Sequence, residues 1–161
     1  MIQNSLLCKD APQSTMSWFT ASATSARARI VTEHATYLSL LDAVGRYFDL
    51  MFDSDVSHFD QVFASSAQLH GLRDGNLRLL PAQDYKTALA AGASPKAKNA
   101  PRHQEILLVD FSSPTQAVVK VRVRINSIQY LDYLSYHCIS GAWLITAKSF
   151  HVERRFETPA N

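Results

Sequence analysis

The chain has 161 residues, a length typical of one domain that buries an apolar core without disulfides or a structural metal. Hydrophobic residues make up 47% of it and charged residues 19%, as in ordinary globular proteins. The net charge of +2 lacks the basic excess of nucleic-acid-binding proteins, and no apolar run reaches the ~20 residues of a membrane span.

The N-terminal 30 residues are rich in Ser, Thr and Ala and show no periodicity. They predict a tail or extension, or a start at Met16, ahead of one α+β domain at 31–155 and a short C-terminal tail at 156–161. From Thr32, a residue suited to an N-cap, apolar residues recur every three or four positions and predict a helix to about Asp53. Its expected core face holds Tyr37, Leu38, Leu41, Val44, Phe48 and Met51.

Four further elements are predicted before residue 93. In chain order they are a short helix at 56–63, a strand at 68–73, a return strand at 76–80 and a helix at 81–92. The dipeptide Asp74-Gly75 favours a tight hairpin between the two strands. Residues 92–101 form a polar loop that either borders a site or is a plain connector.

The C-terminal half predicts antiparallel strands at 105–111, 117–125, 128–139 and 143–152. Two-residue turns at Asn126-Ser127 and Ser140-Gly141 fix their register. The expected pairs are Ile125 with Ile128, Val123 with Tyr130, Val121 with Asp132, Cys138 with Trp143, Tyr136 with Ile145, Leu134 with Ala147, Asp132 with Ser149, and Tyr130 with His151.

This register predicts an apolar inner face with polar side chains at its centre. The apolar members are Val119, Val121, Val123, Leu134, Trp143, Ile145 and Ala147, and the polar ones are Tyr130, Asp132, Tyr136, Ser149 and His151. The outer face is amphipathic and suits solvent or a dimer partner, with Lys120, Arg122, Arg124, Gln129, Leu131, Tyr133, His137 and Lys148.

Asp132 and His151 form the candidate catalytic pair, diagonal to each other across two strands. A carboxylate in an apolar pocket can act as a general base. The alternative is a structural carboxylate that anchors the first helix or the strand ends. The candidate ligand-binding residues are Tyr130, Tyr136, His70, Tyr47 and Trp143, each of which can equally be a core or surface residue.

Three stretches carry a family resemblance: YFDLMFDSDVSHFDQVFASSAQLHGLRDGNL at 47–77, VVKVRV at 118–123 and YLDYLSYHCISGAWLITAKSF at 130–150. With the order of elements, they resemble the nuclear transport factor 2-like (cystatin-like) superfamily, closest to its lumazine-binding-like and SnoaL-like branch. The resemblance implies a cone, in which three helices pack into a curved, mixed, mostly antiparallel sheet around a pocket. It also implies a homodimer through the open sheet face.

The resemblance implies no single activity. One expected function is binding of a small apolar or aromatic ligand in the cone. The alternatives are a cofactor-free isomerase, cyclase or dehydratase with Asp132 as base, and an interaction subunit that uses the open sheet face. Cys8 and Cys138 lack metal-ligand spacing, so no metal or cofactor is expected, and a cytoplasmic location without nucleic-acid or membrane partners is predicted.

Overall fold

The computed structural model describes residues 17–73 and 75–157. By internal contacts the chain divides into two compact units, residues 1–35 and residues 36–161. The second unit holds the whole sheet, so it is the unit that carries the predicted pocket residues.

Helix α1 spans Ser17–Asp53 and passes through both units. The predicted helix start at Thr32 is therefore wrong, because the helix already includes residues 17–31. The physical reason is composition, because Ala recurs through 21–35 while Gly and Pro are absent there. Met16 lies outside the described residues. Nowhere in residues 17–73 and 75–157 is a helix both long and apolar enough to cross a bilayer.

The buried face of α1 in the second unit agrees in part with the predicted one, since Val44, Phe48 and Met51 are buried as predicted. Leu40, Val44, Tyr47 and Met51 are almost fully buried, together with Ala43, Phe48 and Leu50. Tyr37 and Leu38, which were expected in the core, are 41% and 47% exposed. Three-to-four spacing therefore located the face that packs, but not the position at which its burial begins.

The two shorter helices follow the predicted positions closely. The 3-10 helix η1 spans Val56–Gln61, and its N-cap Asp55 accepts a hydrogen bond from the backbone N–H of Ser57. Helix α2 spans Ala82–Ala91, with Pro81 at its N-cap and Gly92 at its C-cap. These two elements and the C-terminal part of α1 are the three helices that were expected to pack with the sheet.

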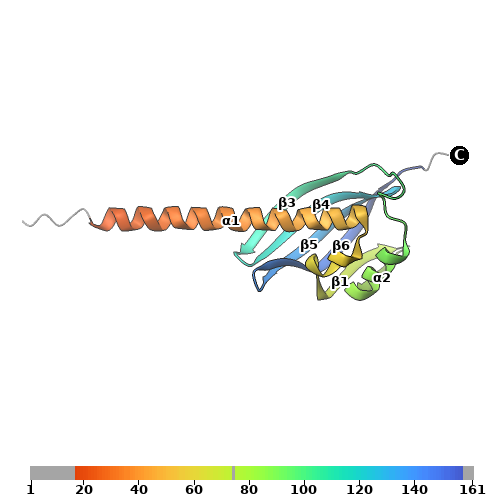
Figure 1. Ribbon diagram of the computed structural model, residues 1–161, viewed down its shortest axis with the longest axis horizontal. Helices are drawn as coiled ribbons and strands as arrows, with labels where there is room; N and C mark the ends of the chain where they lie inside the picture. Colours follow the sequence, from red (N-terminus) through yellow and green to blue (C-terminus); the bar gives the residue numbers. More distant parts are fainter. Residues whose placement is uncertain (1–16, 74, 158–161) are drawn as a thin grey trace, which may run out of the picture. The chain divides into compact units, whose positions relative to one another are not determined.

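Six strands form one curved sheet in the order β2-β1-β6-β5-β4-β3 (Figure 1). Their bounds are Phe63–Arg73, Asn76–Pro81, Gln104–Ser113, Gln116–Ile125, Ile128–Ile139 and Ala142–Arg155, for β1 to β6. The pair β1–β6 is parallel and every other neighbouring pair is antiparallel. The predicted mixed, mostly antiparallel α+β fold is confirmed.

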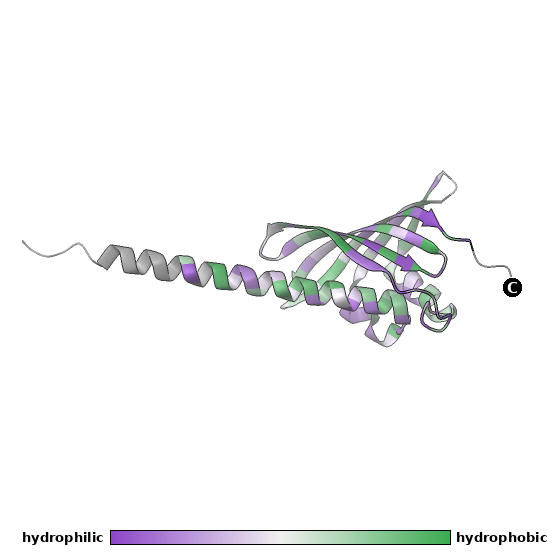
Figure 2. Ribbon diagram, turned by 90° about the horizontal axis from the view of Figure 1, so that it is seen from above, coloured by the Kyte–Doolittle hydropathy of each residue, from purple (hydrophilic) through white to green (hydrophobic). Residues whose placement is uncertain are grey.

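Hydrophobic and hydrophilic residues alternate along the strands (Figure 2). The inward residues of β4 and β5, such as Val119, Val121 and Leu134, are fully buried. On the outer face, Arg122 bridges Glu105 of β3 at 2.5 Å and Glu153 of β6 at 2.8 Å. Arg122 and Gln129 lower the pKa of Glu153 to about 2. Arg122 therefore serves as a cross-strand tie on this face.

The predicted register holds through both tight turns and then changes inside β6. Ile125 pairs with Ile128, Cys138 with Trp143 and Tyr136 with Ile145, as predicted. A bulge follows, because Tyr136 opposes Ile145 while Ser135 opposes Ala147. From there Leu134 opposes Lys148, Asp132 opposes Phe150, and Leu131 opposes His151.

The predicted pairs of Leu134 with Ala147, Asp132 with Ser149, and Tyr130 with His151 are therefore wrong. A one-residue shift in a strand exchanges its two faces. Lys148, predicted on the outer face, is buried at 4% exposure, while Ser149 and His151 are exposed.

The bulge also brings Phe150 against Gly71 of β1. A Cβ atom on Gly71 would lie 2.2 Å from the ring of Phe150, whereas one on Gly45 of α1 would meet no atom within 4 Å. We predict that Gly71→Ala lowers the free energy of unfolding by about 1–3 kcal/mol through overpacking. Gly45→Ala, the matched control, should raise it by roughly 0.5–1 kcal/mol because glycine disfavours helix interiors. Urea unfolding measures both, and equal effects would contradict this packing.

Candidate functional site

A buried ion pair lies on the inner face of the sheet. The Lys148 Nζ of β6 is 3.0 Å from Asp132 Oδ2 of β5. Tyr47 of α1 donates a hydrogen bond to Asp132 Oδ2 at 2.5 Å and accepts one from Lys148 Nζ at 2.8 Å. The three side chains form a closed triangle that joins the helix to the two central strands, and we call it the Lys148 triad.

The surroundings of the triad fix its protonation. Burial raises the pKa of Tyr47 well above its ordinary value, and the Asp132 charge raises it further, so Tyr47 is a neutral donor. Burial by itself lowers the pKa of Lys148, but Asp132 and nearby phenols raise it, and its net pKa is above the usual value. Lys148 is therefore an ammonium beside a carboxylate, and the triad is neutral as a whole.

Two aromatic rings add to the stabilisation of this ammonium. Nζ of Lys148 lies 5.2 Å from the ring centroid of Tyr47 and 5.6 Å from that of Tyr85. The hydroxyl of Tyr85 donates to the sulfur of Met51 at 3.1 Å. Tyr85 thus presents its ring to the ammonium while its hydroxyl is engaged with α1.

Lys148 also lines a cavity of about 260 Å³ between α2 and the sheet. Most of the wall is apolar, and the other lining residues are Leu69, Leu80, Tyr85, Ala88, Leu89, Ile125, Tyr130 and Phe150. Neither Asp132 nor Tyr47 is among them, so Lys148 is the member of the triad that lines the cavity. The site consists of this cavity and the triad behind it.

The structure brings some of the predicted residues together. Tyr130 lines the cavity, and Tyr47 contacts Asp132 directly. Tyr136 is fully buried, and burial raises the pKa of its phenol, whose hydroxyl has no hydrogen-bond partner within the described part of the chain. Trp143 is a core residue whose indole N–H donates to Ser39 Oγ at 3.1 Å.

The two histidines among the predicted site residues lie elsewhere. His151 is exposed opposite Leu131, so the structure does not place it beside Asp132 as the predicted register required. His70 pairs with Leu79 and Ser149, on the strand face opposite to the buried Leu69. Neither histidine lines the cavity.

Lys148 is the functional residue that sequence reasoning missed. A signal was present, because the apolar positions of β6 change phase along the strand. Trp143 and Ile145 are odd-numbered, whereas Phe150 and Val152 are even-numbered. Such a change of phase within one strand is typical of a bulge, and it places Lys148 on the face of Phe150.

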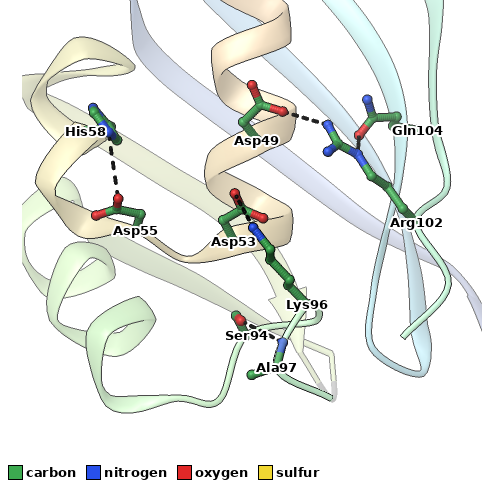
Figure 3. Close-up of polar contacts among 9 residues, drawn as sticks. All are labelled: Asp49, Asp53, Asp55, His58, Ser94, Lys96, Ala97, Arg102 and Gln104. Atoms are coloured by element: carbon green, nitrogen blue, oxygen red, sulfur yellow. Dashed lines mark hydrogen bonds and ion pairs between the residues drawn. The ribbon is translucent and has the colours of Figure 1, made fainter. Parts of the chain in front are cut away.

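A second hollow, of about 380 Å³, lies beside the C-terminal end of α1 and η1. Its acidic residues are already paired, since Asp49 contacts Arg102 at 2.6 Å, as Figure 3 shows. Asp53 contacts Lys96 at 3.3 Å. These pairs tie the loop after α2 to the helix, and no residue of that loop is among those that line either hollow. In the described chain, no three His, Cys, Asp or Glu side chains group to hold a metal.

Comparison with solved structures defines the class of fold. An NTF2-like protein of unknown function from Silicibacter pomeroyi has a TM-score of 0.65 and 18% identity, covering 73% of this chain and 95% of that one. A second one, from Shewanella baltica, has a TM-score of 0.64 and 19% identity, covering 73% and 94%. A cystatin-like fold protein from Nostoc punctiforme has a TM-score of 0.55 and 12% identity, covering 74% and 92%. The chain thus has the nuclear transport factor 2-like fold.

The family follows from the sequence match. Residues 35–151, well over half of the chain, match the family described as "Putative lumazine-binding". The chain belongs to this family. No match is found among curated proteins.

The triad yields a prediction on stability. Lys148→Met leaves Asp132 buried without its cation and should lower the free energy of unfolding by about 3–5 kcal/mol. The double variant Lys148→Met/Asp132→Asn removes both charges and should lose less than Lys148→Met alone. Lys120→Met, on the outer face, is the control and should lose under about 1 kcal/mol. Urea unfolding measures all three, and a double variant no more stable than Lys148→Met would contradict the pairing.

The raised pKa values predict alkaline unfolding. Below the ordinary pKa values of Tyr and Lys, about 10, the folded and unfolded chains hold the same protons at Tyr47 and Lys148. Above that pH the unfolded chain releases them first, so the free energy of unfolding should be constant to about pH 10 and then fall. Urea midpoints between pH 8 and 11.5 measure the decline. The Tyr47→Phe variant should show a less steep decline in the free energy of unfolding. An unchanged slope would contradict the raised pKa of Tyr47.

Proposed function

We propose that this protein binds a small, largely apolar molecule in the cavity between α2 and the sheet. The observation that carries the proposal is an apolar cavity with Lys148 among its lining residues. Ligand sites in proteins are typically concave and apolar, with a few fixed polar groups that orient the ligand. The triad supplies such a fixed group, because Asp132 and Tyr47 hold Lys148 at 3.0 and 2.8 Å.

Binding without turnover is the function that the geometry supports best. A general base must come within hydrogen-bond reach of the proton that it removes. Asp132 is 0% exposed, lies outside the cavity wall and is held by Lys148 and Tyr47. Lys148 retains its proton at neutral pH because its pKa is raised, which disfavours it as a nucleophile or base. These contacts favour the structural role of Asp132 over the catalytic one.

Two exposed alanines of α2 offer a test of the cavity with a matched control. Ala88 of α2 is exposed and lines the cavity, whereas Ala90 is exposed on the same helix and does not. We predict that Ala88→Trp obstructs the cavity and weakens ligand binding at least tenfold, while Ala90→Trp leaves it unchanged. The two variants should have similar stability without ligand, since both changes lie at exposed helix positions.

The measurement is the ligand-induced rise in melting temperature over a panel of small apolar and aromatic compounds, followed by calorimetric titration. A ligand at 100 times its Kd stabilises the folded chain by about 2.7 kcal/mol, which is readily measured. Lumazine belongs in the panel because the family's description names it. A panel that leaves the wild-type protein unshifted, or ligands that bind both variants equally, would overturn the proposal.

A further inference from the structure

We infer that the ligand is a neutral, apolar compound of about two fused rings that carries one carbonyl-type oxygen, which accepts a hydrogen bond from Lys148. This inference rests on the proposed binding function and specifies the chemistry of the same site. It follows from the number of donors on the ammonium, the charge of the triad and the size of the cavity.

The donor count calls for an acceptor on the ligand. An ammonium has three N–H donors and no acceptor. Lys148 directs one toward Asp132 Oδ2 and one toward the hydroxyl of Tyr47. Lys148 also lines the cavity, and its Nζ lies 5.6 Å from the ring centroid of Tyr85, another lining residue, so a ligand oxygen there can accept a further hydrogen bond. A ligand without an acceptor would cover this charged donor and remove it from water at a cost in free energy.

The charge of the triad favours a neutral acceptor. The Lys148 charge is already balanced by Asp132 at 3.0 Å, with both side chains almost fully buried. A ligand carboxylate at Lys148 would add a second negative charge beside Asp132 in a partly desolvated site. Like charges at such separations repel strongly where the effective dielectric constant is low. A ketone, lactone or amide oxygen accepts the same hydrogen bond without that repulsion.

The volume of the cavity limits the size of the apolar part of the ligand. An apolar cavity of about 150 Å³ in another protein accommodates benzene. The cavity here is about 260 Å³, which leaves room for a second fused ring. Its wall consists mainly of aliphatic side chains and the rings of Phe150, Tyr85 and Tyr130, which offer apolar surface to such a compound. A bicycle with many ring nitrogens would find too few partners in this wall.

Three probes on one skeleton test the inference with the wild-type protein. They are α-tetralone, its hydrocarbon tetralin and the tetralin carboxylate, measured by calorimetric titration at pH 7. We expect α-tetralone to bind at least tenfold more tightly than tetralin, since a hydrogen bond from a charged donor is stronger than one between neutral groups. The carboxylate should bind more weakly than the ketone. Equal binding of ketone and hydrocarbon, or tightest binding of the carboxylate, would overturn the inference.

A double variant tests whether Lys148 causes the preference for α-tetralone over tetralin. In Lys148→Met/Asp132→Asn, which leaves no unpaired charge, tetralin should still bind and the preference for α-tetralone should fall to less than threefold. A preference that stays at tenfold would overturn the role of Lys148. If other panel compounds bind the wild-type protein and lose affinity in Ala88→Trp while none of the three probes binds, the ligand class is wrong and the proposed function stands. If no compound binds at all, the proposed function itself fails.

Discussion

The buried pair of Lys148 and Asp132 is the interaction on which the interior of the sheet depends. Removing two charges from water is costly, and their attraction offsets that cost only with close contact and further hydrogen bonds. Tyr47 supplies both further bonds, one donated to Asp132 and one accepted from Lys148. Because Tyr47 belongs to α1, the triad also fixes how this part of the helix faces β5 and β6. An apolar helix surface alone would allow α1 to pack in several orientations about its own axis.

One extra residue in β6 makes the pair possible. The bulge near Thr146 exchanges the two faces of the strand, so Lys148 and Phe150 turn inward and Ser149 and His151 turn outward. The Phe150 ring then requires a residue without a side chain at Gly71 of the neighbouring strand. The bulge therefore has three effects. It turns the charge of Lys148 inward, it packs Phe150 against Gly71, and it makes Lys148 and Phe150 part of the cavity wall.

The chemistry of the site follows from which member of the triad meets the cavity. A free carboxylate on the wall would favour proton transfer, whereas here Lys148 lines the cavity and Asp132 does not. A protonated lysine held by two partners is a rigid donor, suited to orienting an acceptor on a ligand. In our proposal, the nuclear transport factor 2-like fold supplies the cavity, and these particular side chains supply its selectivity. Proteins that share this fold can therefore differ in function, because function depends on the residues of the site.

The sequence by itself determined the strands, the two tight turns and the register up to Ile145. Hydrophobic alternation and turn chemistry are local, and Asn126, Ser140 and Gly141 adopt the positive φ values that such turns require. It also located Asp132 and Tyr130 on the inner face. Only the tertiary structure decided where the buried face of α1 begins, since Tyr37 and Leu38 continue the apolar spacing and yet are exposed. It also decided that Lys148, and not His151, meets Asp132, because a bulge is stabilised by the neighbouring strands and helix, which contact β6 only in the folded chain.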